Sequence, residues 1–106
     1  MNPEVIENMI EKGCDSYEAR LAAGQARLKA DNLEKALEHL QKATAHKPGQ
    51  TMAWQELGTV LNRLERPDEA RQAWQQGVET ARANGDKQAE KVMGVFLRRL
   101  DRQDRT

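Results

Sequence analysis

The chain has 106 residues, of which 32% are charged and only 4% are aromatic, and its 17 basic side chains balance its 17 acidic ones. This length suits one domain with a modest core, and many charges with few aromatics are typical of helical proteins rather than of β-sandwiches or barrels. A net charge of zero with no basic stripe argues against a nucleic-acid-binding protein, so no nucleic acid is expected as a partner.

Helix-start and helix-stop signals recur along the chain, whereas no sustained alternation of polar and apolar residues predicts a strand. The expected helices span, in chain order, residues 3–12, 17–30, 33–46, 51–64, 67–84 and 86–102. Their N-terminal signals are Asn2, Asp15 or Ser16, Asn32, Thr51, Pro67 and Asp86. The joints between them are short, and short joints make consecutive helices antiparallel neighbours.

An internal repeat appears when the sequence is shifted by 34 residues. Gly24 then falls on Gly58, Ala36 on Ala70 and Gln41 on Gln75. The turns KADN and LERP coincide as well, and positions around the identities keep their residue type. A fixed period of this length indicates stacked helix pairs, because each pair needs matched size at its contact points and little else.

The spacing resembles the tetratricopeptide repeat, whose first helix follows the pattern W-x2-L-G-x2-Y. Residues 51–84 match it best, with Trp54, Leu57, Gly58, Leu61 in place of the tyrosine, Ala70, Trp74 and Gly77. In residues 17–50 the same places hold Arg20, Ala23, Gly24, Arg27, Ala36, Leu40, Ala43 and Pro48. Two arginines therefore stand where the family has aromatic residues, and the first copy departs from the pattern in its first helix.

The resemblance implies an all-α fold, a right-handed superhelical stack of antiparallel helix pairs with about six helices in one domain, 1–106. The expected parts are an N-terminal capping helix 3–13, repeats 17–50 and 51–84, and a C-terminal capping helix 86–102. Val92 and Val95 follow Gly58 and Leu61 by 34 residues, so the last helix resembles the first half of a third repeat.

The glycines inside helices ask for an explanation, because glycine costs about 1 kcal/mol relative to alanine in a helix. In a paired-helix repeat, Gly24 and Gly58 are expected where the partner helix crosses, with Ala36 and Ala70 doing the same from the second helix. Trp54 is expected to fill the space beside Gly58. Its burial is worth a few kcal/mol, which exceeds the cost of the glycine.

The resemblance also implies a concave groove, lined by the first helix of each repeat, that binds an unidentified protein or peptide. The groove residues expected here are Leu21, Gln25, Leu28, Lys29, Met52, Gln55, Glu56, Thr59, Asn62 and Arg63. As an alternative function, the wide apolar arc of the last helix predicts a structural unit that dimerises through Met93, Phe96, Leu97 and Leu100. The chain is then a monomer or a weak homodimer.

No catalytic, metal or cofactor site is predicted. His39 and His46 are seven residues apart, too far for the i, i+4 spacing of two ligands on one helix, and are expected at the surface. Cys14 lies in a joint, and nothing in the sequence marks it as a nucleophile. Neither glycine turn has the spacing or the lysine of a phosphate-binding loop. The chain is therefore expected not to be an enzyme.

The compartment expected for the chain is the cytoplasm. No segment approaches the ~18 apolar residues that span a bilayer, so no membrane contact is expected. Residues 1–13 have neither the basic lead nor the long apolar run of a secretory signal peptide. Cys14 is the single cysteine, so no disulfide can form within the chain.

Overall fold

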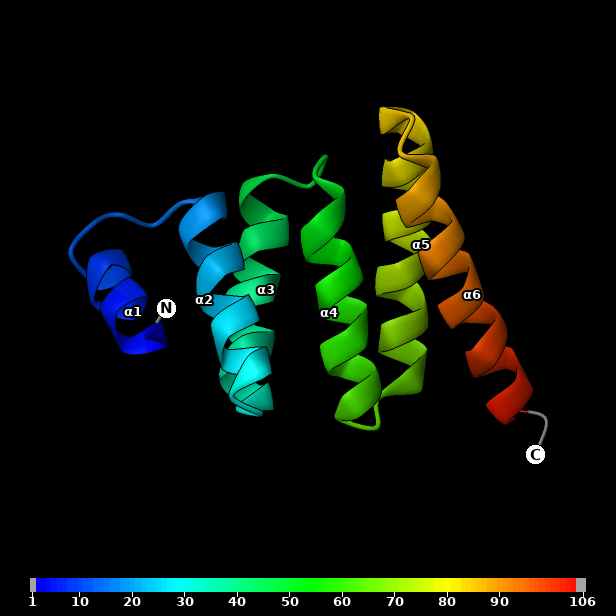
Figure 1. Cartoon of the computed structure of the whole chain (residues 1–106), viewed down its shortest axis with the longest axis horizontal. Coiled ribbons are helices and arrows are strands. Elements are labelled where there is room, and N and C mark those ends of the chain that lie inside the picture. The colour runs from blue at the N-terminus through cyan, green and yellow to red at the C-terminus, as the bar shows by residue number, and fades with distance from the viewer. Residues whose placement is uncertain (1, 105–106) are drawn as a thin grey trace.

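The computed structural model describes residues 2–104 as six α-helices joined by short turns, with no strand among them (Figure 1). The helices are α1 (Pro3–Glu11), α2 (Tyr17–Lys29), α3 (Leu33–His46), α4 (Thr51–Arg63), α5 (Pro67–Asn84) and α6 (Lys87–Asp104). The all-α expectation is confirmed, and every expected helix begins and ends within about two residues of its place. Helix ends cannot be defined more closely than one or two residues, so the expected and observed bounds agree within that limit.

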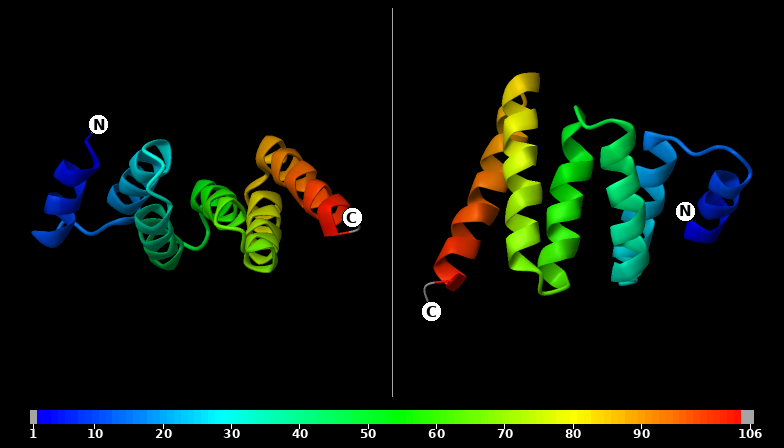
Figure 2. Two further views of the ribbon diagram at one scale, coloured as in Figure 1. Left: turned by 90° about the horizontal axis from the view of Figure 1, so that it is seen from below. Right: turned by 180° about the vertical axis from the view of Figure 1, so that it is seen from behind.

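The helices stand side by side in one row, each packed mainly against its neighbours in the chain. The described part measures 45 × 30 × 19 Å along its principal axes. α2, α4 and α6 run in one direction, and α3 and α5 run in the other (Figure 1). Seen from below, α2 and α6 lie along one side of the row and α3 and α5 along the other, with α4 set between them (Figure 2). The fold is thus a stack of helical hairpins.

Side-chain caps fix where several helices start. The Asn2 and Ser16 side chains accept hydrogen bonds from backbone N–H groups of α1 and α2, and Asn32 and Asp86 do the same for α3 and α6. Each cap satisfies a backbone donor that a helix end leaves without a partner, which is worth about 1 kcal/mol. The capping signals read from the sequence are therefore used as expected at these four helices.

The turns that end α2 and α4 have the same backbone conformation, 34 residues apart. Asp31 and Glu65 both adopt positive φ, 62° and 59°. The N–H groups of the residues that follow, Asn32 and Arg66, reach back to the carbonyls of Arg27 and Leu61. This left-handed turn closes a helix by satisfying its last carbonyls. The periodicity of the sequence is thus reproduced in the backbone.

Close contact through glycine holds each hairpin together. A Cβ on Gly24 would lie 2.7 Å from Leu40 Cγ, and one on Gly58 would overlap the indole ring of Trp74, with Cε2 at 2.6 Å. Both glycines are buried, and Leu40 and Trp74 are at most 3% exposed. The expectation that these glycines mark the helix crossings is therefore confirmed, since any side chain there would force the helices apart.

The aromatic residue over Gly58 is Trp74, so the expectation that Trp54 fills this space was wrong. The crossing of α5 over α4 brings Trp74 onto the glycine, and Trp54 faces the next contact, where its Cβ is 3.2 Å from the Cβ position of Gly77. The Trp54 indole N–H donates to the Pro48 carbonyl at 2.9 Å. Trp54 therefore braces the turn before α4 rather than the crossing itself.

The last helix follows the second repeat at a spacing of 36 residues, not 34. Met93 is fully buried and takes the place of Leu57, and Gly94 follows it as Gly58 follows Leu57. Val92, which the 34-residue shift placed over Gly58, is only half-buried. α5 is four residues longer than α3, with 18 residues against 14, and the turn that follows α5 is two residues shorter than the turn that follows α3. Together these differences account for the two extra residues.

Candidate functional site

The side of the row formed by α2, α4 and α6 carries a hollow near the C-terminal ends of α2 and α4. It has a volume of about 610 Å³ and lies between the C-terminal halves of α2 and α4. Its lining residues are Gln25, Leu28, Lys29, Asp31, Glu56 and Arg63. Helix neighbours three or four positions apart supply them, so one face of each helix forms one wall.

Glu56 is the most unusual group in this hollow. Its side chain is half-buried between α2 and α4, and this burial raises the pKa of its carboxyl above the ordinary value. A hydrogen bond from Gln25 across the hollow acts in the opposite direction by favouring the charged form. Glu56 thus offers an acceptor in a partly desolvated place, where a donor on a bound segment would interact more strongly than in open water.

A second hollow, of about 300 Å³, adjoins the first and lies between α4 and α6. Its lining residues are Thr59, Asn62, Arg63, Trp74, Phe96, Arg99, Leu100 and Gln103. Its floor is aromatic, because the rings of Trp74 and Phe96 lie with centroids 5.0 Å apart and planes tilted by 40°. The Trp74 N–H donates to the Gln55 carbonyl at 3.1 Å, which fixes the indole in position.

Arg63 lines both hollows, so they meet at its side chain on one side of the three helices. We call the two hollows together the α2–α4–α6 groove and define it by Gln25, Leu28, Lys29, Glu56, Thr59, Asn62, Arg63 and Phe96. Its sides are amides, a hydroxyl and charges, and its floor is apolar. Binding pockets commonly combine an apolar floor with a few oriented polar groups.

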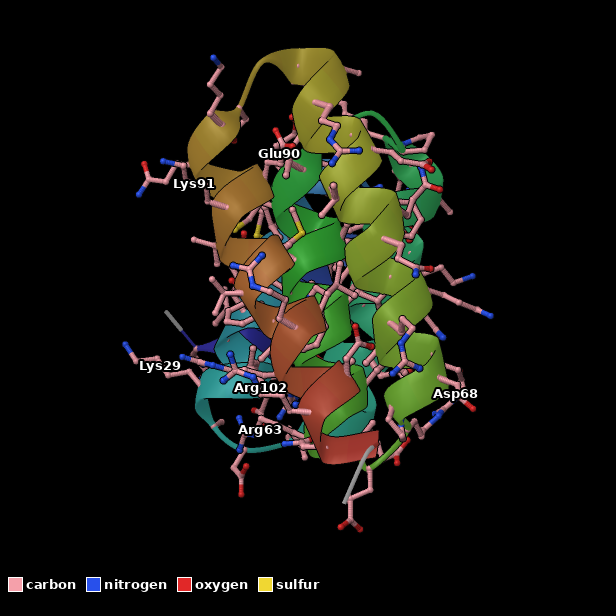
Figure 3. The ribbon with its side chains drawn as sticks, turned by 90° about the vertical axis from the view of Figure 1, so that its right-hand side faces the viewer. Lys29, Arg63, Asp68, Glu90, Lys91 and Arg102 are labelled. Carbon is pink, nitrogen blue, oxygen red and sulfur yellow. The ribbon has the colours of Figure 1, made fainter. Side chains whose placement is uncertain are left out.

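Positive charge gathers at the end of the groove where α2, α4 and α6 finish. Figure 3, which looks along the row, shows Lys29, Arg63 and Arg102 on the same side of the molecule. Arg63 also pairs with Asp31, while Lys29 and Arg99 have no acidic partner among the described residues. Cations at helix C-termini offset the helix dipole, and here they also give the groove a basic end.

Seven of the ten residues expected in the groove line it: Gln25, Leu28, Lys29, Glu56, Thr59, Asn62 and Arg63. The other three lie nearer the N-terminal ends of their helices, outside both hollows: Leu21 half-buried against the core, Gln55 half-buried and Met52 exposed. Sequence reasoning missed Asp31 and Arg99, which enter through a turn and through the shifted register of α6.

The expected self-association surface is corrected by burial. Met93 and Leu100 are at most 1% exposed, because Met93 packs on Gly77 and both side chains belong to the central core. They are therefore unavailable to a second chain. Phe96 lies on the floor of the groove and Leu97 is half-buried, so only these two of the four expected residues are accessible to a second chain.

A network of charged side chains ties α1 to the first repeat and explains why arginines replace the family's aromatic residues there. Arg27 donates to Glu7 at 2.5 and 3.0 Å, and His39 contacts the same carboxylate at 2.6 Å. The Arg27 hydrogen bond, assisted by His39, lowers the pKa of Glu7 to about 2. Arg27 thus links α2 to α1 by an ion pair where a bulky ring would pack.

His39 corrects the expectation that both histidines are at the surface, because it is only 6% exposed. Its Nδ1 lies 3.1 Å from Arg20 Nη1. Since arginine only donates, Nδ1 accepts and Nε2 carries the proton that it shares with Glu7. The Arg20 guanidinium also donates two hydrogen bonds to the Asp15 carboxylate, at 2.8 and 2.9 Å.

His46 is exposed, as expected, and contacts the same Asp15 at 2.8 Å. Hydrogen bonds from Arg20, the larger effect, and from His46 hold the pKa of Asp15 well below its ordinary value. The carboxylate next to Cys14 is therefore already engaged, and it is not placed to act as a base for the exposed thiol.

Within residues 2–104 no group of three or more His, Cys, Asp or Glu side chains could hold a metal ion. No described helix has the length and apolar character needed to cross a membrane.

No family model matches the chain, but individual known proteins resemble it in sequence and in fold. A TPR repeat-containing protein of Pseudomonas aeruginosa is 44% identical over 99 residues, which cover 93% of this chain and 94% of that protein. A protein of Bordetella parapertussis with a solution structure has a TM-score of 0.83 at 36% identity, covering 98% of this chain and 90% of its own. A tetratricopeptide repeat domain protein of Salinibacter ruber has a TM-score of 0.76 at 27% identity, covering 81% of this chain and 96% of its own.

Proposed function

The chain belongs to the tetratricopeptide-repeat family, and from that premise we propose that it is a non-catalytic module whose α2–α4–α6 groove binds a segment of another protein. Repeat proteins of this kind use the concave surface of the stack for interaction. The observation that carries the proposal is that the two hollows share Arg63 as a lining residue, which places them next to each other on the side formed by α2, α4 and α6.

The size of the groove limits the partner to a short segment. Three helices packed at about 10 Å leave a groove of about 20–25 Å, which accommodates roughly seven extended residues. A footprint of that kind lies at the weak end of protein interfaces, so an affinity in the micromolar range is expected. The module therefore suits reversible contacts.

The chemistry of the groove indicates what the segment carries. An apolar side chain fits over the floor made by Trp74 and Phe96, and acidic groups fit the end formed by Lys29 and Arg63. The half-buried Glu56 accepts a backbone or side-chain donor in the middle of the groove. We propose an extended segment with one apolar anchor followed by acidic residues, and the basic end of the groove fixes its direction.

The absence of catalysis is part of the proposal and is supported by how the reactive groups are used. Asp15, His39 and His46 are all engaged in the network that holds α1, α2 and α3 together. The exposed Cys14 lies in the α1–α2 turn, in neither hollow of the groove. The single thiol of the chain therefore shares neither hollow with a general base.

The test uses two triple variants of the whole chain and a library of displayed peptides. In the first variant, Gln25, Thr59 and Asn62, which line the groove, are all replaced by alanine. In the second, the exposed neutral residues Gln41, Gln72 and Gln75 of α3 and α5 are replaced by alanine. Peptides selected on the wild type are expected to lose at least tenfold in affinity, about 1.4 kcal/mol, for the first variant only. Both variants should unfold at the wild-type temperature. Equal binding by the wild type and the first variant would disprove the groove assignment.

A further inference from the structure

The glycines at corresponding places in α2, α4 and α6 differ in what packs against them. Gly24 lies against Leu40 and Gly58 against Trp74, each with no room for a side chain. Gly94 takes the corresponding place in α6, 36 residues after Gly58, yet a Cβ there would meet only Arg98 Nη1 at 3.7 Å. A helix glycine costs about 1 kcal/mol, and within residues 2–104 nothing packs on Gly94 to offset it. The place where a following helix would cross α6 is open.

A hollow of about 410 Å³ surrounds Gly94. Half-buried Val78 of α5 and Leu97 of α6 give it an apolar lining, and Lys87, Lys91 and Arg98 stand around it. None of these three cations has an acidic partner among the described residues, whereas the remaining cation of the hollow, Arg82, pairs with Glu90 at 2.7 Å. The end of the row beyond α6 is thus apolar at its centre and basic at its margin.

The opposite end of the row has the complementary character. α1 exposes Val5 and Met9, one turn apart on the same stripe, with 53% and 49% of their surface accessible. Pro3–Glu11 contains three glutamates and no lysine or arginine, and two of them, Glu4 and Glu11, are exposed. Ile6 is buried and holds the helix to its own chain. Figure 1 places α1 and α6 at the two ends of the row.

We propose that α1 of a second copy of this chain lies across Gly94 of the first, so that copies associate head to tail. Val5 and Met9 of the incoming helix cover the apolar centre, as Trp74 covers Gly58. The exposed Glu4 and Glu11 of α1 face the unpaired cations of the hollow, which sets the direction of approach. A second copy is the occupant because one chain offers both halves of the interface, an acidic amphipathic helix and a basic hollow.

An interface of this form is heterologous, and it leaves one free end of each type on every assembly. It therefore produces a series of oligomers rather than a closed dimer. A nine-residue helix is about 14 Å long, so the buried area is below that of standard interfaces and the association is weak. The surface is separate from the α2–α4–α6 groove, and a peptide bound there leaves it unchanged.

The proposal is tested by complementation between two blocked variants of the full chain. In the first, Val5→Lys with Met9→Lys removes the apolar stripe of α1 and adds positive charge. In the second, Gly94→Glu fills the hollow and reverses its charge, and the new side chain lies in open space, so the fold is retained. Gln72→Lys with Gln75→Lys on exposed positions of α5 is the charge-matched control for the first. Circular dichroism confirms that all variants fold.

Sedimentation velocity then measures mass against concentration. The wild type and the control are expected to rise above the 12.0 kDa of one chain as concentration increases. Each blocked variant alone stays monomeric, with association weakened at least tenfold. An equimolar mixture of the two recovers dimers and stops there, because only one pair of intact ends remains.

Three results would overturn the proposal: a wild type that stays monomeric at millimolar concentration, a mixture that stays monomeric, or self-association of either blocked variant. The last would indicate symmetric pairing of one end instead.

Discussion

Replacing Gly58 by alanine tests the packing of α4 against α5 with a single methyl group. The added Cβ would lie 2.6 Å from Trp74 Cε2 and nearer still to the indole nitrogen. A rigid ring that is only 3% exposed cannot swing into solvent without leaving the core. The indole must therefore shift, and with it the hydrogen bond to the Gln55 carbonyl and the ring contact with Phe96.

The expected loss can be estimated from these contacts. Overpacking a core costs about 1–3 kcal/mol, a buried hydrogen bond contributes about 1 kcal/mol and an aromatic pair about 0.5–1.5 kcal/mol. The Trp74 contacts are weakened rather than abolished, and alanine returns about 1 kcal/mol of helix propensity. Gly58→Ala is therefore expected to destabilise the chain by about 2–3 kcal/mol.

Gly94→Ala is the matched control, because the same substitution is made at the corresponding place in α6, where the nearest atom is 3.7 Å away. It gains the helix propensity without the clash, and is expected to stabilise the chain by up to about 1 kcal/mol. Urea denaturation followed by circular dichroism at micromolar concentration measures both. The two variants should differ by about 2–4 kcal/mol, or roughly 10–20 °C in Tm. A Gly58 variant as stable as the Gly94 variant would refute the packing argument.

Three further outcomes follow from single residues. Because Arg27 lowers the folded pKa of Glu7 to about 2, Glu7 stabilises the fold above its unfolded pKa of about 4.5, and this contribution disappears as pH falls toward 2. Glu7→Gln should thus lower the free energy of unfolding by about 1 kcal/mol at pH 7, after solvent screening, and should leave it unchanged near pH 2. Urea titrations at the two pH values measure both, and a loss that does not depend on pH would contradict the ion pair. Glu65→Gly relieves a φ of 59° and should raise stability by about 0.5–1 kcal/mol in thermal denaturation, and a lower Tm would show that the turn is unstrained. The exposed Cys14 should react with a thiol reagent in the native protein as fast as in the unfolded chain, whereas protection would place it under cover.

The sequence was sufficient for the helices and for most of the groove because both depend on local signals. Caps such as Ser16 and Asn32 act within one turn, so their effect can be read directly from the residue order. The 34-residue spacing from Gly24 to Gly58 then fixes which faces meet. Residues such as Gln25 and Glu56 follow from helical periodicity once the faces are known.

What the sequence left open depends on how the helices cross. Both tryptophans of the second repeat suit a place beside Gly58, and only the crossing of α5 over α4 shows that Trp74 takes it. His39 looked like a surface residue because its partners, Glu7 and Arg20, come from helices 32 and 19 residues away. The two-residue shift of α6 was readable in the pair Met93 and Gly94, but a fixed period of 34 concealed it.

The most direct test of the proposed function is nuclear magnetic resonance of the labelled chain with a peptide selected from a random library. Shifts in the amide spectrum on titration report which helices the peptide contacts. Binding in the groove predicts that the changes gather on the α2, α4 and α6 residues that line it, centred on Glu56 and Arg63 and weakened by salt at the basic end. Changes confined to the exposed residues of α3 and α5 would contradict the account.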